Sequence, residues 1–214
     1  MVTNGGSLQC AGINIGAHRH ICAFFNGFDE EHRVLGSFYK DGFDRGEKVT
    51  HIVADEHRDE YLKRLADAGT DVQRMTETGQ LEVRRWAKMY AQDNRFDHDA
   101  MLASAERLIQ SCAEAGYART KLVGHHLEWL FRDPSAVKNL VEYEARLNGL
   151  LAKYDVPVVC VYDSSKFGAS VALDIMRTHP LVIIGGLLRQ NPFFVPPEQF
   201  LVELRERESS RTES

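Results

Sequence analysis

The chain has 214 residues and a net charge of −5, with 43% hydrophobic and 27% charged residues. This balance is typical of one globular domain, and the negative charge argues against direct binding to nucleic acid or to an anionic membrane. Four scattered cysteines, Cys10, Cys22, Cys112 and Cys160, form no CxxC pair and favour a reducing compartment. We therefore expect a cytoplasmic protein without a transmembrane segment.

The first predicted unit is a strand over 18–25, followed after a turn by a helix to about residue 41. In a P-loop protein this corner would carry GxxxxGK[ST], whose amides and lysine bind phosphates. This chain instead places Asp29, Glu30 and Glu31 at the start of the helix, where carboxylates occupy the position of a phosphate. We therefore expect no hydrolysis of ATP and no magnesium–nucleotide cofactor.

Short apolar runs alternate with amphipathic stretches along the rest of the chain, which predicts stacked βα units. The predicted strands cover 48–54, 81–86, 121–125 and 156–162; the predicted helices lie around 61–66, over 97–115, from 134 to about 151, over 167–177 and after 196–197. The strand over 156–162 is expected to be central, because central parallel strands are continuously apolar. The final apolar segments predict a hairpin in which 181–188 pairs with 193–195 across a loop at 189–192.

These elements predict an α/β fold with a mainly parallel central sheet, helices on both faces and an antiparallel hairpin at the C-terminal edge. Residues 1–17 are glycine-rich and almost uncharged, so we expect a flexible leader there, although Ile13 and Ile15 suit a short edge strand. Residues 18–205 form the single predicted domain, and 206–214 are expected to be a disordered tail.

Five short motifs, in this order, resemble the MEDS family, the methanogen/methylotroph DcmR sensory domain. They are His20-Ile-Cys22 with Phe24-Phe25, Gly42 to Glu47, Cys160 to Asp163, His179-Pro180 and Asn191-Pro192. The resemblance implies a RecA/KaiC-like three-layer sandwich that lacks the phosphate-binding loop. It also implies a sensory domain that binds a small, hydrocarbon-like molecule without catalysis and reports to a signalling or transcriptional regulatory partner. Since no output domain is recognisable in the chain, we expect that partner to act in trans.

The first candidate site is on the first predicted strand, where His18, His20 and Cys22 alternate and so point to one face. Imidazole and thiolate together suit a transition metal, and His125, His126 or Cys160 are the further donors that such a site would need. The alternative is that Cys22 is a core residue and His20 a hydrogen-bonded buried histidine.

The second candidate site is the rim at the carboxyl ends of the predicted strands, where open α/β sheets bind ligands. Its residues are Asn26, Phe28, His125, His126, Tyr162 and Asp163, which complete the predicted ligand-binding set with His20 and Cys22. Because His20 begins its strand, we expect it to lie away from this rim. The other histidines, His32, His51, His57, His98 and His179, are expected at the surface or at helix caps.

No nucleophile, base and orienting group can be assembled from the sequence, so we expect a sensor and not an enzyme. One alternative is a residual nucleotide-binding protein or enzyme that uses the rim. The other is a ligand-free interaction scaffold in which Phe193 and Phe194 dock a partner or, in a homo-oligomer, a second copy. Packing of both rings beneath the last helix is the competing interpretation of those two residues.

Overall fold

The computed structural model describes residues 8–85, 96–117, 119–125 and 133–212. Within them a seven-stranded sheet has the order β5-β4-β6-β7-β3-β8-β9, and every adjacent pair is parallel except β8 and β9. The central position of β7 confirms the prediction from its apolar run. The strands are β3 (His20–Phe25), β4 (Lys48–Val53), β5 (Leu81–Arg85), β6 (Thr120–His125), β7 (Val158–Asp163), β8 (Leu181–Ile184) and β9 (Leu187–Gln190).

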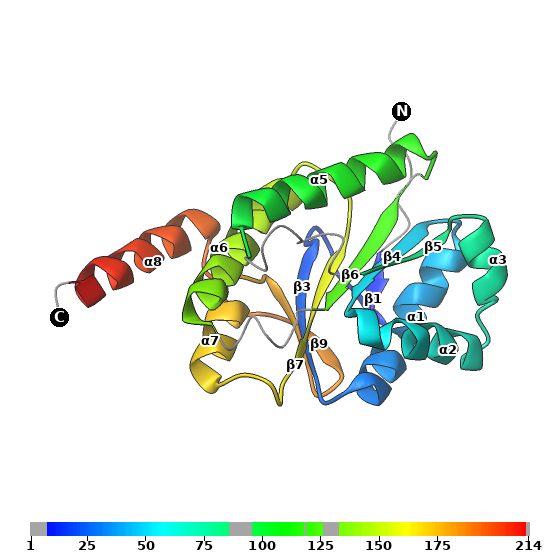
Figure 1. The fold of residues 1–214 in the computed structure, drawn as a ribbon, viewed down its shortest axis with the longest axis horizontal. Helices are drawn as coiled ribbons and strands as arrows, with labels where there is room; N and C mark the ends of the chain where they lie inside the picture. The colour runs from blue at the N-terminus through cyan, green and yellow to red at the C-terminus, as the bar shows by residue number, and fades with distance from the viewer. Residues whose placement is uncertain (1–7, 86–95, 118, 126–132, 213–214) are drawn as a thin grey trace.

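Helices cover both faces of this sheet, which gives the expected three layers (Figure 1). On one side lie α1 (Phe28–Asp44), α2 (Arg58–Asp67), the 3-10 turn η1 (Asp55–His57) and α3 (Val72–Glu77); on the other lie α5 (His98–Glu114), α6 (Pro134–Leu151), α7 (Ala169–Arg177) and α8 (Pro197–Thr212). Strand side chains alternate between the two cores: Ile21 and Ala23 pack with α1, whereas Cys22 packs with α5 and α6. No described helix is long and apolar enough to cross a membrane.

The C-terminal hairpin is shorter than the sequence predicted. Its strands β8 and β9 are joined by Gly185 and Gly186, whose φ angles of 56° and 76° form the tight two-residue turn that glycine permits. Residues 193–195 therefore follow the hairpin and are not one of its strands, so that part of the prediction was wrong.

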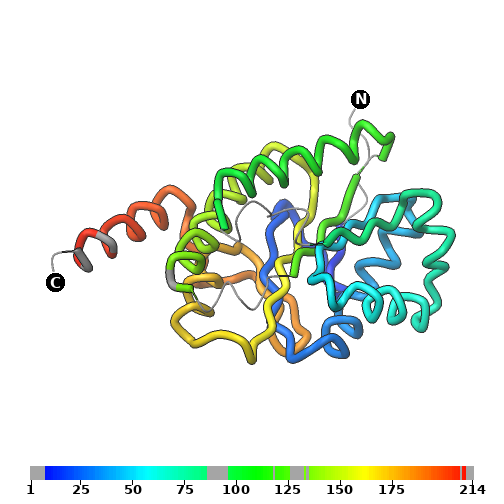
Figure 2. Tube along the Cα trace, viewed as in Figure 1, coloured from blue at the N-terminus to red at the C-terminus, as the bar shows by residue number. Residues whose placement is uncertain are grey.

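Both chain ends differ from the expectation of unstructured segments. Within 8–17, the two-residue strands β1 (Gln9–Cys10) and β2 (Ile13–Asn14) pair, and Leu8, Cys10 and Ile15 are buried in the core on the α1 side. At the other end α8 continues to Thr212, and Figure 2 shows it extending away from the body of the domain.

A buried lysine ties α1 to the sheet. Lys121 on β6 has no exposed surface, and its Nζ donates to the Phe38 carbonyl at 2.8 Å and to Asp41 Oδ2 at 2.7 Å. Glu47 Oε2 lies 3.6 Å from the same nitrogen. The absence of a side chain at Gly42 makes room for this lysine, because a Cβ there would lie 3.1 Å from Lys121 Cδ. Charge neutralisation of Lys121 thus depends on the segment from α1 to β4.

We expect Lys121→Met to lower the free energy of unfolding by about 1.5–3 kcal/mol, because it removes the charged hydrogen bonds of the buried ammonium while Asp41 keeps Arg45 and Glu47 keeps Arg119. Equilibrium urea unfolding measures this change. The control is Lys40→Met, which breaks the exposed pair between Lys40 and Asp44 and should cost less than about 1 kcal/mol. Equal losses in the two variants would contradict the role given to Lys121.

Candidate functional site

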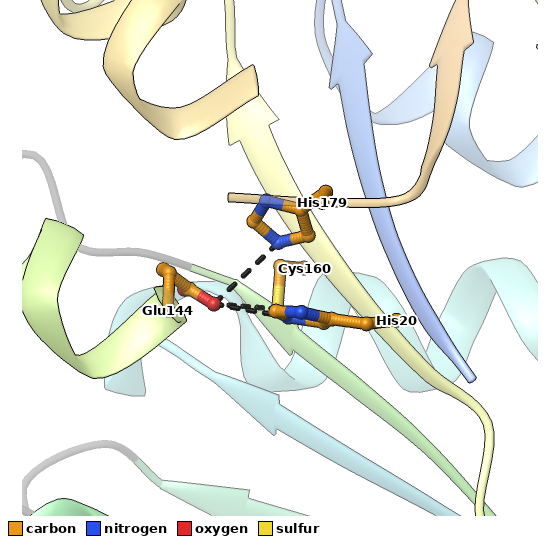
Figure 3. A group of neighbouring side chains, drawn as sticks. All are labelled: His20, Glu144, Cys160 and His179. Carbon is orange, nitrogen blue, oxygen red and sulfur yellow. Dashed lines mark hydrogen bonds and ion pairs between the residues drawn. The ribbon is translucent and has the colours of Figure 1, made fainter. Parts of the chain in front are cut away.

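Four ionisable side chains from separate segments converge in the interior beneath α6 (Figure 3). We call them the buried polar centre: His20 on β3, Glu144 on α6, Cys160 on β7 and His179 just before β8. Each is at most 3% exposed, and one ligand atom from each lies within 4.8 Å of the other three. Such a concentration of polar groups in an apolar core requires that they satisfy one another, because burial of an unpaired polar group is costly.

Glu144 Oε2 is the atom on which the others converge. It lies 3.1 Å from His20 Nε2, 3.5 Å from His179 Nε2 and 3.5 Å from Cys160 Sγ. The other carboxylate oxygen, Oε1, accepts a hydrogen bond from the Tyr162 hydroxyl at 2.8 Å. Tyr162 therefore belongs to this interior site and not to the rim where the sequence analysis placed it.

The tautomer of His20 follows from its neighbour Asn148. The Asn148 amide nitrogen donates to three carbonyls, at distances of 2.8, 3.1 and 3.2 Å, so the amide oxygen faces His20 Nδ1 at 3.2 Å. An amide oxygen only accepts, so Nδ1 carries the hydrogen. Burial, reinforced by the charge of His179, lowers the pKa of His20 to about 4. The ring is neutral at pH 7, and its Nε2 presents a lone pair to Glu144.

His179 has the same arrangement. Its Nδ1 lies 2.8 Å from the Ile175 carbonyl oxygen, which can only accept, so Nδ1 carries a hydrogen and Nε2 faces Glu144. That Nε2 is buried without a hydrogen-bond partner in the part of the chain that the structure describes. Both imidazoles therefore turn Nε2 toward the same carboxylate oxygen.

Cys160 contributes the fourth group. Its Sγ lies 3.5 Å from His20 Nε2 and 3.5 Å from Glu144 Oε2. Burial, together with the negative charge of Glu144, holds the pKa of this thiol well above its usual range. Without an added positive charge, Cys160 is a neutral thiol.

The sequence anticipated this centre only in part. His20 and Cys160 lie together, and the sequence had offered Cys160 as a further metal donor for His20. Cys22, which the sequence paired with His20, lies outside the centre. Its thiol is 3.7 Å from the Leu181 carbonyl, although Cys22 and Cys160 are register partners on adjacent strands. His125 lies on the other side of the sheet, with Glu31 of α1. His126 falls outside the described residues.

Two members of the centre were missed. His179 was expected at the surface and has no exposed surface, because the turn after α7 folds it into the core. Glu144 falls within the apolar stripe of α6, three residues after Val141 and three before Leu147, both of which are buried. A carboxylate on a core-facing stripe was the available sequence signal, since such a group is buried only when it is paired.

A second polar group lies on the α1 side, toward the carboxyl ends of β4 and β6. The Tyr61 hydroxyl lies 2.5 Å from His51 Nε2, the Tyr39 hydroxyl donates to Glu31 at 3.4 Å, and His125 Nε2 is 3.1 Å from Glu31 Oε1, though not aligned for a hydrogen bond. We call these five residues the rim cluster. His51 has no exposed surface, so its expected surface position was wrong.

The remaining predicted rim residues have mainly local partners. Phe28 lies 6.0 Å from His125, ring centre to ring centre, in a stacked arrangement. Asp163 Oδ1 accepts hydrogen bonds from the backbone and hydroxyl of Ser165, and the backbone N–H of the exposed Asn26 donates to Glu30. Phe28 and His125 are thus brought together, whereas Asn26 and Asp163 stabilise turns.

The two aromatic residues predicted to bind a partner follow β9. Phe193 is 59% exposed and Phe194 is half-buried. The alternative in which both rings pack beneath α8 is therefore wrong for Phe193. Their loop is anchored by Asn191, whose amide nitrogen donates to the carbonyls of Met176 and His179.

Comparison with known proteins identifies the family. A family model of the methanogen/methylotroph, DcmR sensory domain, MEDS, matches residues 19–180, a range that includes the whole buried polar centre. The chain belongs to the MEDS family. This assignment confirms the resemblance inferred from the five motifs.

A further comparison relates this MEDS chain to a curated protein. It is 24% identical over 179 residues to the transcriptional repressor DcmR of Methylorubrum extorquens, a match that covers 83% of this chain and 64% of the repressor. The chain thus spans slightly less than two thirds of that relative.

The fold of this MEDS chain is similar to that of a solved KaiC-like protein. A KaiC-like protein of Pyrococcus horikoshii is 14% identical with a TM-score of 0.57, over 83% of this chain and 80% of that one. The flagellar accessory protein FlaH of Methanocaldococcus jannaschii is 12% identical with a TM-score of 0.48, over 80% and 75%.

The rim cluster predicts a loss of stability in acid. Burial, together with the charges of His125 and His32, holds the pKa of His51 well below 6.5 in the folded state. An unfolded histidine has a pKa near 6.5, so the unfolded chain binds one more proton below that pH, and stability falls as the pH drops. The stability that comes from keeping His51 neutral is fully present above about pH 7. Between pH 7.5 and 5.5 the free energy of unfolding should fall by about 1.4 kcal/mol on this account.

Urea unfolding at these two pH values, on Tyr61→Phe and on Tyr61→Phe with His51→Leu, isolates the histidine because both variants lack the hydroxyl partner. The loss on acidification should be smaller by about 1.4 kcal/mol in the double variant. Identical acid losses would show that His51 is not the group that titrates.

Proposed function

We propose that this MEDS domain is a non-catalytic sensor whose input is a small molecule or metal ion held at the buried polar centre. Its output is a change in α8 and in the loop carrying Phe193 and Phe194, which a separate regulatory protein reads. The family, and the relative named as a transcriptional repressor, support regulation as the purpose of such a signal.

The observation that carries this proposal is that the centre connects directly to the helices on which α8 rests. Glu144 is part of α6, and His179 follows α7 after a single intervening residue. On α8, Phe200 is fully buried in the core formed by α6 and its neighbours. Arg177 pairs with Glu203 at 2.6 Å, and Asp174 pairs with Arg207 at 2.8 Å, which joins α7 to α8.

The burial of the centre supports sensing in preference to turnover. Its four residues are at most 3% exposed, so a ligand there is enclosed by the protein and exchanges only when the surrounding helices move. An enzyme needs repeated access of substrate and release of product. A sensor needs instead that binding and conformation be coupled, which enclosure provides.

Hydrogen exchange tests the coupling between the centre and α8. We expect Glu144→Gln to speed exchange of α8 amides by on the order of tenfold, because the altered centre loosens the packing of α6 and the turn after α7. The control is Glu142→Gln, the same change two residues earlier on α6, where the half-buried carboxylate pairs with His98 and Arg146. If α8 exchange is unchanged in Glu144→Gln, or changes equally in both variants, the proposed route of the signal is wrong.

We also expect no hydrolysis of ATP by the purified chain. At the start of α1, Asp29 pairs with Arg64, Glu30 accepts a hydrogen bond from the Asn26 amide, and Glu31 is turned inward to Tyr39 and His125. The negative charge of these carboxylates opposes a triphosphate at this corner. A phosphate-release assay with magnesium should give the buffer rate, and sustained hydrolysis that copurifies with the chain through successive columns would contradict this expectation.

A further inference from the structure

We propose that the buried polar centre binds one divalent transition-metal ion of the zinc type, through His20 Nε2, His179 Nε2, Glu144 Oε2 and Cys160 Sγ. The proposal rests on the proposed sensory function and specifies its ligand. It assigns the fourth ligand to Cys160 in place of Cys22.

One atom of the buried centre has unused hydrogen-bonding capacity. His20 Nε2, His179 Nε2, Glu144 Oε2 and Cys160 Sγ face one enclosed space. Of these atoms, the fully buried His179 Nε2 has no hydrogen-bond partner among the described residues. A metal ion in this space coordinates all four atoms at once, His179 Nε2 included.

The spacing of the four atoms matches tetrahedral coordination. With metal–nitrogen and metal–oxygen bonds of about 2.0–2.1 Å and a metal–sulfur bond of about 2.3 Å, the edges of a tetrahedron are about 3.3–3.6 Å. The corresponding distances are 3.1 Å for His20 to Glu144 and 3.5 Å for His179 to Glu144. Cys160 lies 3.5 Å from both His20 and Glu144. The two remaining edges, from His179 Nε2 to His20 Nε2 and to Cys160 Sγ, are at most 4.8 Å. Three of the four measured edges thus fall in the tetrahedral range, and the fourth is about 0.2 Å shorter.

The orientation of each imidazole is fixed from behind, as metal-binding histidines require. His20 Nδ1–H donates to the Asn148 side chain, and His179 Nδ1–H donates to the Ile175 carbonyl. These bonds fix each ring with Nε2 aimed inward. The Tyr162 hydroxyl, which donates to Glu144 Oε1, leaves Oε2 as the inward carboxylate oxygen.

Charge and ligand chemistry select the ion. Two neutral imidazoles, a carboxylate and a thiolate carry two negative charges, so a divalent ion makes the buried centre neutral overall. Binding breaks the Cys160 S–H bond, forms a metal–sulfur bond and releases that proton to solvent. Imidazole and thiolate favour zinc and its neighbours over magnesium and calcium, which prefer oxygen ligands. Four protein ligands leave no coordination position for a reacting water, as in structural zinc sites.

The test is metal analysis of the whole chain, combined with refolding in Co²⁺. Protein purified without chelators from zinc-supplemented medium should contain about one equivalent of metal per chain. Because the centre is enclosed, removal of the metal should require unfolding in chelator. Refolding with Co²⁺ should restore the visible bands of tetrahedral cobalt and a thiolate-to-cobalt charge-transfer band.

Cysteine variants identify the ligand. Cys160→Ser should lose the charge-transfer band and most of the bound metal, and His179→Gln most of the metal. Cys112→Ala, which removes another buried thiol from the same core, should retain both, and so should Cys22→Ala. Retention in Cys160→Ser with loss in Cys22→Ala would overturn the ligand set proposed here. If the ligand variants do not fold, the wild-type cobalt spectrum decides, because the absence of a thiolate–cobalt band after refolding overturns the site.

The outcomes separate this proposal from the sensory function on which it rests. A chain without metal and without a cobalt spectrum overturns the metal site. If Glu144→Gln still alters hydrogen exchange in α8, the coupling of the centre to α8 stands and the input is a different ligand. A metal-binding chain whose α8 is insensitive to the centre keeps the metal site and loses the sensory route.

Discussion

A carboxylate with no contact with water, Glu144, is the constraint on which the α6 side of this domain depends. Because an isolated buried carboxylate is strongly disfavoured, its position is tenable only where other groups converge on it. Those groups come from β3, β7 and the turn after α7, segments distant in sequence. The contacts of Glu144 therefore link the register of the central strands to the positions of α6 and α7 on the sheet.

Buried polar groups that need partners from neighbouring elements are also found on the other face of the sheet. Central parallel strands are usually apolar throughout, yet β6 carries the buried Lys121 and β4 the buried His51. In both cases a partner lies on a helix of the α1 layer: Asp41 for Lys121, and Tyr61 for His51. Polar groups inside this domain therefore fix which helix lies over which strand, a choice that apolar packing alone specifies less sharply.

The fold places the buried polar centre away from the corner where a P-loop protein would hold phosphate. The first turn of α1 is filled by the chain's own carboxylates, and the buried polar centre lies on the opposite face, where His20 begins β3 and His179 precedes β8. For the proposed sensor this has a mechanical consequence. A ligand at an open rim can exchange without much motion, whereas exchange at an enclosed centre requires α6 or α7 to yield, so occupancy and helix position are coupled.

Periodicity and short ordered motifs are local properties, so the sequence was sufficient to predict the layered α/β architecture, the central position of β7 and the family. It also indicated His20 as a buried polar residue. The tertiary structure alone decided that Cys160 and not Cys22 joins His20, since both cysteines face the same side of adjacent strands and only the approach of α6 distinguishes them. The tertiary structure was also needed to find Glu144 and His179, because these residues lie on segments far apart in sequence that come together only in the folded chain. The turn at Gly185-Gly186 was missed although its signal is local. The two adjacent glycines indicate a turn, but they lie within the apolar run 181–188, which was predicted to be one strand.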